Sequence, residues 1–163
     1  MSDSKPTAAI FVDVQNIYYT CKQAFQQSFN YRQLYSQLAV DYKLVTANAY
    51  AIESNNDGQH KFQTALRSMG FTVKLKPYIQ RQDGTAKGDW DVGITIDIMD
   101  ASSAVEHVFL LSGDGDFDRL MQRLKQSDNL TTHVISAEPL TALSLINSID
   151  HYTPISADML LSK

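Results

Sequence analysis

The sequence predicts an α/β fold: a three-layer α/β/α (Rossmann-like) domain with a mainly parallel central sheet. Segments with the composition of buried strands alternate five times with segments of helical periodicity, which is the pattern of a parallel sheet covered on both faces. The apolar runs AAIFVDV and HVFLLS are continuous rather than alternating, as is typical of strands buried on both sides. The 163 residues contain no repeat or linker, so we expect residues 1–163 to form a single domain.

In the first half of the chain we expect the order strand, helix, helix, strand, helix, strand. Apolar residues four positions apart predict the helices, as in Ile17, Cys21 and Phe25. The polar turn SNNDGQ precedes the third helix, and Gly70 is expected to end it. The last strand differs from the others because its apolar and polar residues alternate. These six elements span 8–14, 16–25, 31–42, 43–52, 60–70 and 71–79.

In the second half, a polar, glycine-containing loop precedes alternating helices and strands. Pro154 is expected to limit a short final strand at an edge of the sheet, because proline cannot donate a ladder hydrogen bond. The loop spans 80–90, the helices about 91–102, 116–126 and 140–149, and the strands 107–112, 131–137 and 151–156.

Composition and charge narrow the class of protein. The formal net charge of −4 argues against a protein that coats nucleic acid, since such domains carry a basic excess. It does not exclude an enzyme acting on nucleic acid, because carboxylates in a metal site lower the net charge. A lone cysteine, Cys21, cannot form an internal disulfide, and no apolar stretch approaches the ~20 residues of a membrane span. We therefore expect a cytoplasmic protein without membrane contact.

Acidic residues follow predicted strands at two places. Asp13 closes the first strand, and Asp114 and Asp116 follow the fourth. The carboxyl ends of parallel strands meet at one edge of a sheet, where ligands of such folds bind. The segment KGDWDVGITID could join them there. The candidates at this edge are Asp13, Asn16, Asp89, Asp91, Asp97, Asp114 and Asp116.

This group of side chains suits a hard divalent cation. Several like charges close together raise one another's pKa and cost stability unless a cation neutralises them. The candidate ligands are all oxygens, which favours Mg²⁺ or Mn²⁺ over zinc. Such a metal could turn a bound water into a nucleophile and neutralise charge on a phosphate.

Several of these aspartates also have a purely structural interpretation. Asp114 or Asp116 could cap the helix that begins near Phe117, and Asp89 could cap the helix before it. Asp97 is harder to explain in that way, because it lies between two isoleucines. Asp91 and Asp97 are six residues apart, which separates them by ~120° around a helix, so both cannot point at one ion. The hypothesis depends on three segments converging.

Three motifs resemble those of a known family. FVDVQNIYY resembles the opening motif of NYN-domain proteins, in the LabA-like branch of the PIN-like nuclease superfamily. KGDWDVGITIDIM is similar to the central K-G-x-D helix motif of that family, and LLSGDGDFDRLMQRLKQ to its S-G-D-x-D-F motif. All three occur in family order, and the resemblance covers nearly the whole chain. It implies a PIN-like α/β/α domain and a metal-dependent ribonuclease using Mg²⁺ or Mn²⁺.

The resemblance also implies roles for particular residues. Asn16 matches the asparagine of the opening motif, and Ser112 the serine that is expected to orient a neighbouring carboxylate. This chain has one residue more than the family pattern after Gly88, so Asp89 could share or replace the role of Asp91. Asp97 matches a supporting acid of the central helix. Catalytic and metal-binding roles are implied for Asp13, Asp91, Asp114 and Asp116.

A nuclease must also hold the nucleic-acid backbone and bases. The stretch KLKPYIQRQDGTAKGDW is the most basic and aromatic of the chain, and we expect Arg81, Lys87 and Trp90 to contact RNA. Lys74 and Lys76 fit better as solvated side chains on one face of a strand.

Other side chains with reactive or aromatic groups are assigned lesser roles. Tyr18 and Tyr19 follow Asn16 directly and could flank the site, with at least one of them in the core. The histidines are scattered without ligand spacing, and His107 and His133 are expected to be structural.

Two further functions stay open from the sequence. One is a regulatory or protein-binding domain that keeps the acidic pocket without catalysis, since fold does not establish function. The other is a phosphatase for small phosphate esters, which would share the metal chemistry. The oligomeric state also stays open.

Overall fold

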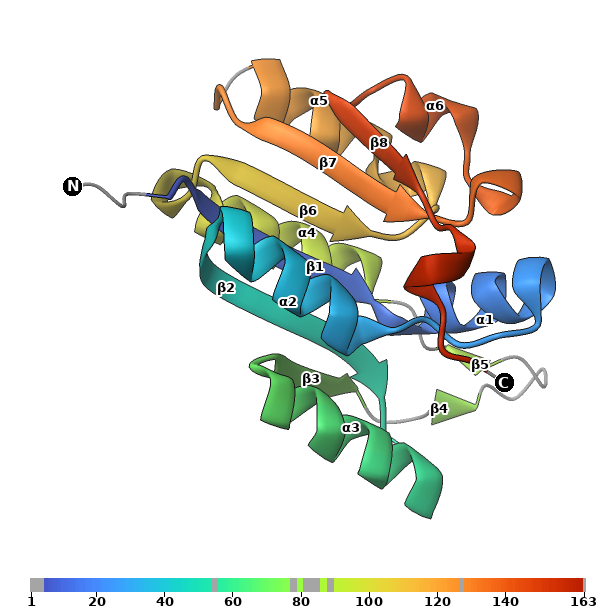
Figure 1. Ribbon diagram of the computed structural model, residues 1–163. Helices are drawn as coiled ribbons and strands as arrows, with labels where there is room; N and C mark the ends of the chain where they lie inside the picture. Colours follow the sequence, from blue (N-terminus) through green and yellow to red (C-terminus); the bar gives the residue numbers. More distant parts are fainter. Residues whose placement is uncertain are drawn as a thin grey trace.

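The computed structural model is an α/β structure with a six-stranded sheet in which every neighbouring pair is parallel (Figure 1). It describes residues 5–53, 56–76, 79–80, 86–87, 90–126 and 128–162, with the backbone alone at 79–80 and 86–87. The strand order is β3-β2-β1-β6-β7-β8. These strands are β1 (Thr7–Asp13), β2 (Lys43–Ile52), β3 (Thr72–Lys76), β6 (His107–Leu111), β7 (Thr131–Ser136) and β8 (His151–Pro154).

The helices connect these strands and cover both faces of the sheet. The α-helices are α1 (Val14–Phe25), α2 (Tyr31–Asp41), α3 (Asp57–Met69), α4 (Asp91–Ala101), α5 (Asp118–Gln126) and α6 (Leu143–Ile146). Short 3₁₀ helices are η1 (Ser102–Ala104), η2 (Gly115–Phe117), η3 (Glu138–Leu140) and η4 (Ala157–Met159). Among the described residues, no helix is both long and apolar enough to cross a membrane.

Strand β1 separates two hydrophobic cores, as its continuous apolar sequence predicts. Its even-numbered residues Ala8, Ile10 and Val12 pack into the core shared with α1, α2 and α3. Ala9 and Phe11 pack into the other core, with α4 and α5. In Figure 1, α2 accordingly crosses one face of the sheet and α4 the other. The predicted three-layer α/β/α fold is confirmed.

Two segments differ from the prediction. Strand β3 ends at Lys76, before the predicted end at 79. A short antiparallel pair, β4 (Ile79–Gln80) and β5 (Ala86–Lys87), spans the junction of the predicted strand and loop. The helix expected over 140–149 is shortened to the four residues of α6, after η3. Ala142, the residue before α6, has an extended backbone conformation, and its N–H donates to the carbonyl of Gly113 at 3.0 Å. A tertiary hydrogen bond therefore overrides the local helical periodicity.

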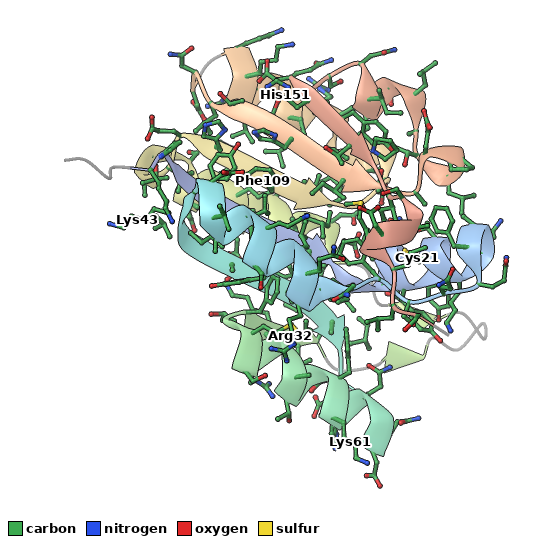
Figure 2. The ribbon with its side chains drawn as sticks, viewed as in Figure 1. Cys21, Arg32, Lys43, Lys61, Phe109 and His151 are labelled. Atoms are coloured by element: carbon green, nitrogen blue, oxygen red, sulfur yellow. The ribbon has the colours of Figure 1, made fainter. Side chains whose placement is uncertain are left out.

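Three of the four histidines meet on one face of the sheet. His107 Nδ1 lies 3.0 Å from His133 Nε2. The His133 ring stacks on Phe109 at 4.0 Å and on His151 at 5.0 Å between centroids; the latter two are labelled in Figure 2. Burial lowers the pKa of His133 to about 4, with the neighbouring histidines adding to the effect. Burial also lowers the pKa of His107. His107 and His133, which were expected to be structural, therefore form one packed cluster with His151.

The sheet has a topological switch point between β1 and β6, where the side on which strands are added changes. From β1 the next strands, β2 and β3, are added on one side, whereas β6, β7 and β8 are added on the other. Ligands of open parallel sheets bind beyond the carboxyl ends of the strands at such a switch point. Asp13 ends β1 and Ser112 follows β6, so the predicted acidic residues flank this position.

Candidate functional site

Three of the predicted carboxylates lie together at this switch point. Asp91, Asp114 and Asp116 each offer a carboxylate oxygen, and these oxygens all lie within 4.8 Å of one another. Asp91 begins α4, whereas the other two belong to the turn after β6. No other such group of three acidic, histidine or cysteine ligands is found within the part of the chain that the structure describes. Two of the three segments that were expected to converge meet through these residues, and the first segment contributes none of the three.

The turn after β6 fixes the relative positions of Asp114 and Asp116. The Asp114 carboxylate accepts a hydrogen bond of 2.9 Å from the backbone N–H of Asp116. It thereby caps η2, as the structural interpretation of the sequence suggested. Capping uses one oxygen of Asp114, so the same residue can hold the turn and still present charge to the site.

Asp13 lies beside this group but outside it. Its side chain is buried, and its Oδ1 accepts from the backbone N–H of Asn16 at 3.4 Å, which caps α1. Ser112 is fully buried; its hydroxyl donates to Asp13 Oδ2 and accepts from the backbone N–H of Asp114, each at 3.2 Å. The hydrogen bond that the family resemblance implied for Ser112 therefore reaches Asp13, and the serine links this carboxylate to Asp114.

Asn16 ties the start of α1 to the same turn. Its side-chain Oδ1 accepts a hydrogen bond of 3.0 Å from the backbone N–H of Gly113. This contact and the one between Asp13 and Ser112 join the ends of β1 and β6. Asn16 is thus a positioning residue in the structure, and its oxygen is occupied by the backbone.

The connection from β7 to α6 supports the turn from the other side. A Cβ atom on Gly113 would lie 2.9 Å from Thr141 Oγ1 and 3.0 Å from the carbonyl of Leu140. A Cβ atom on Gly115 would lie 2.8 Å from that of Ala142. The glycines of SGDGDF therefore allow this close approach. Sequence reasoning missed Thr141, and its only sequence signal was Gly113, the glycine that it packs against.

Asp97 does not join the group of three carboxylates. It accepts hydrogen bonds from Lys74 Nζ at 2.7 Å and from the Tyr50 hydroxyl at 2.8 Å. Six residues of helix place it ~9 Å along α4 from Asp91, too far to share one ion with it. Burial raises the pKa of Tyr50, which remains a protonated donor. Lys74 is consequently part of an ion pair, not the freely solvated lysine that the strand pattern suggested.

We expect Lys74→Met and Asp97→Asn each to lower the free energy of unfolding by about 1 kcal/mol, because each breaks a half-buried, hydrogen-bonded ion pair. The losses should not add in the double variant, with a coupling of at least about 0.5 kcal/mol in urea unfolding. Asp97→Asn should also leave any Mn²⁺-induced rise in Tm unchanged. A lost Mn²⁺ response in this variant would make Asp97 a metal ligand after all.

Trp90 is fixed within the fold. Its indole N–H donates to the carbonyl of Ala51 at 2.8 Å, and its ring packs against Tyr50. The ammonium group of Lys76 lies 4.9 Å from the centre of the indole ring. Trp90 therefore packs over the carboxyl end of β2, and Lys76 is held over it. The side chains of Arg81, Lys87 and Asp89, which were expected near the substrate or metal, lie outside the described residues.

Comparison with known proteins establishes the family. The model of the NYN domain matches residues 7–156. The chain belongs to the NYN domain family. The low amplitude and bright protein LabA of Synechococcus elongatus is 30% identical over 156 residues, which cover 91% of this chain and 83% of LabA. A crystal structure of a Vibrio parahaemolyticus protein of unknown function is 47% identical, covers 99% of both chains and has a TM-score of 0.93. The family that the three motifs indicated is confirmed.

Proposed function

We propose that this protein is a metal-dependent ribonuclease that hydrolyses a phosphodiester bond of RNA. The observation that carries the proposal is the group formed by Asp91, Asp114 and Asp116, whose oxygens lie within 4.8 Å of one another at the switch point of the sheet. Membership of the NYN domain family, whose motifs link it to PIN-like nucleases, supports the reaction and the choice of RNA.

The donor set fits Mg²⁺ or Mn²⁺. It consists of three carboxylates from two separate elements, without a thiolate or imidazole, and hard oxygen ligands favour these ions. Either ion, when bound, would supply an activated water and neutralise charge on the phosphate. Asp91, Asp114 and Asp116 would hold the ion. Without a cation their mutual repulsion opposes the arrangement.

The surrounding residues would position this group. Ser112 fixes the orientation of Asp13 and the backbone of Asp114 through one hydroxyl. Asp13 then adds a negative charge beside the metal ligands, and we infer that it contributes to catalysis from this position. Asn16 holds the turn through Gly113. A turn fixed on both sides keeps the carboxylates in place, which lowers the cost of binding both metal and phosphate.

One observation favours the alternative of a binding domain without catalysis. Lys74, a cation on the segment expected to meet RNA, is already paired with Asp97. Together with the net charge of −4, this leaves less positive charge for a nucleic-acid backbone.

The test is the cleavage of fluorescently labelled single-stranded RNA by the purified protein in Mn²⁺, in Mg²⁺ and in EDTA. We expect cleavage with either metal and none in EDTA. p-Nitrophenyl phosphate in parallel tests the phosphatase alternative. A rise in Tm with Mn²⁺ but no turnover of RNA would contradict the nuclease and support the binding domain.

A further inference from the structure

We propose that Tyr18 and Tyr19 stack on unpaired bases of the substrate, which makes single-stranded RNA the ligand of this site. The inference rests on the proposed function and deepens it. The two tyrosines are adjacent in α1, and their side chains are 48% and 60% exposed. The expectation that at least one of them lies in the core is wrong.

The exposure of Tyr19 follows from the position of the buried stripe of α1. Val14, Ile17 and Cys21 are the buried residues of this helix, and Cys21 is labelled in Figure 2. At about 100° per residue, Tyr19 lies ~200° around the helix from both Ile17 and Cys21. It therefore points away from the core that α1 shares with α2.

Tyr18 and Tyr19 belong to the helix that begins beside the acidic turn. Asn16 accepts a hydrogen bond from Gly113, the residue before Asp114, so the first turn of α1 is held against the acidic turn. Tyr18 and Tyr19 follow Asn16 within one helical turn. Figure 1 shows α1 continuing past the carboxyl ends of β1 and β6. A strand of RNA with its phosphate at the carboxylates could place a neighbouring nucleotide along this helix.

The chemistry of this surface suits a nucleotide. The rings of Tyr18 and Tyr19 are 5.3 Å apart at 77° to each other. Lys22 places its ammonium group 5.9 Å from the centre of the Tyr18 ring. Two aromatic faces beside a cation provide what a base and its phosphate require.

The neighbouring exposed residues favour RNA over a protein partner. Gln15, Lys22 and Gln23 are exposed on the same helix, so the tyrosines do not form part of a continuous apolar patch. The buried centre of a protein interface is depleted of charge and more apolar than this surface. The ring planes are nearly perpendicular, so the two tyrosines cannot stack on two successive parallel bases of a regular duplex. Aromatic stacking by proteins uses unpaired, splayed bases.

The experiment measures binding and cleavage separately. Anisotropy of a fluorescein-labelled 12-residue single-stranded RNA, in Ca²⁺ and checked for intactness on a gel, gives Kd. Cleavage in Mn²⁺ is then compared for that RNA and for a labelled abasic oligonucleotide of the same length, a phosphodiester without bases or other aromatic groups. The variants are Tyr18→Ala/Tyr19→Ala, Tyr18→Phe/Tyr19→Phe and the control Gln23→Ala, each shown to be folded by its Tm.

We expect the double alanine variant to bind RNA about 5- to 150-fold more weakly, the range measured for loss of a stacked base. The phenylalanine variant should bind within about twofold of wild type because it keeps both rings. Turnover of the abasic oligonucleotide should not change in any variant. Equal RNA affinity of the wild-type and alanine proteins would overturn the inference while leaving the nuclease in place. Absence of RNA binding and of turnover by the wild type would overturn both.

Discussion

Asp114→Asn is expected to lower Mn²⁺-dependent cleavage of RNA by about 100-fold or more. A catalytic metal supplies several kcal/mol of charge stabilisation in the transition state, and this variant removes one of its three proposed ligands. Asparagine is as good an N-cap as aspartate. Its side-chain oxygen can accept the hydrogen bond from the Asp116 N–H, so the turn should survive the substitution.

The same variant should change stability in opposite directions with and without metal. In EDTA, removal of one of three charges within 4.8 Å of one another should raise the free energy of unfolding by about 1 kcal/mol. At 100 times its Kd, Mn²⁺ should stabilise the wild type by about 2.7 kcal/mol, and the variant should lose most of this gain. Urea unfolding in EDTA and in saturating Mn²⁺ measures both effects.

Asp118→Asn is the matched control for this experiment. Asp118 begins α5 two residues after Asp116, and its carboxylate accepts from the backbone N–H of Arg119. It lies outside the group of three. We expect its cleavage rate and its Mn²⁺ response to equal those of the wild type. Equal loss of cleavage in both variants would show that charge in this region matters generally, which contradicts a site made by Asp114.

The sequence predicted the layers and the location of the site because both depend on local pattern. A continuous apolar run such as residues 8–12 requires cover on both faces. Parallel strands then bring Asp13 and the turn after β6 to one edge of the sheet, whatever the details of packing. Two of the three grouped carboxylates, Asp114 and Asp116, come from one short motif.

The partners of individual side chains could not be predicted in the same way. Asp97 meets Lys74 and Tyr50 only because α4 lies over β2 and β3, and its spacing from Asp91 does not reveal that contact. Asp13 is held by Ser112 across 99 positions of sequence. The interactions that decide which carboxylates face an ion are therefore tertiary, and local pattern does not contain them.

The histidine cluster is the clearest example of tertiary contacts that local sequence pattern does not predict. His107, His133 and His151 appear scattered in the sequence, yet strand register places them side by side. His133 pairs with Phe109 on β6 and with His151 on β8. A shift of one residue in either pairing would turn the rings to opposite faces. The cluster is thus a consequence of register, which no spacing rule for metal ligands anticipates.

This cluster should make the protein lose stability as the pH falls. The pKa of His133 is lowered from its ordinary value of 6.5 to about 4, so the unfolded chain binds this proton more tightly than the folded one. Stability from this group is complete above pH 6.5 and is lost as the pH falls toward 4. At 1.36 kcal/mol per unit, the loss should reach about 3 kcal/mol. Urea unfolding between pH 7.5 and 4 measures it.

Comparison with His133→Phe separates this effect from other groups that titrate in the same range. The ionisable side chains that face His133 or its neighbours are those of His107, His151, Asp150, Glu106 and Tyr42. Phenylalanine can keep the stack on Phe109 and His151 but cannot take up a proton, so its stability should fall less over this range. His60→Gln, at an exposed position of α3 away from the cluster, should follow the wild type. Parallel curves for wild type and His133→Phe would mean that the carboxylates, not this histidine, set the acid limit of the fold.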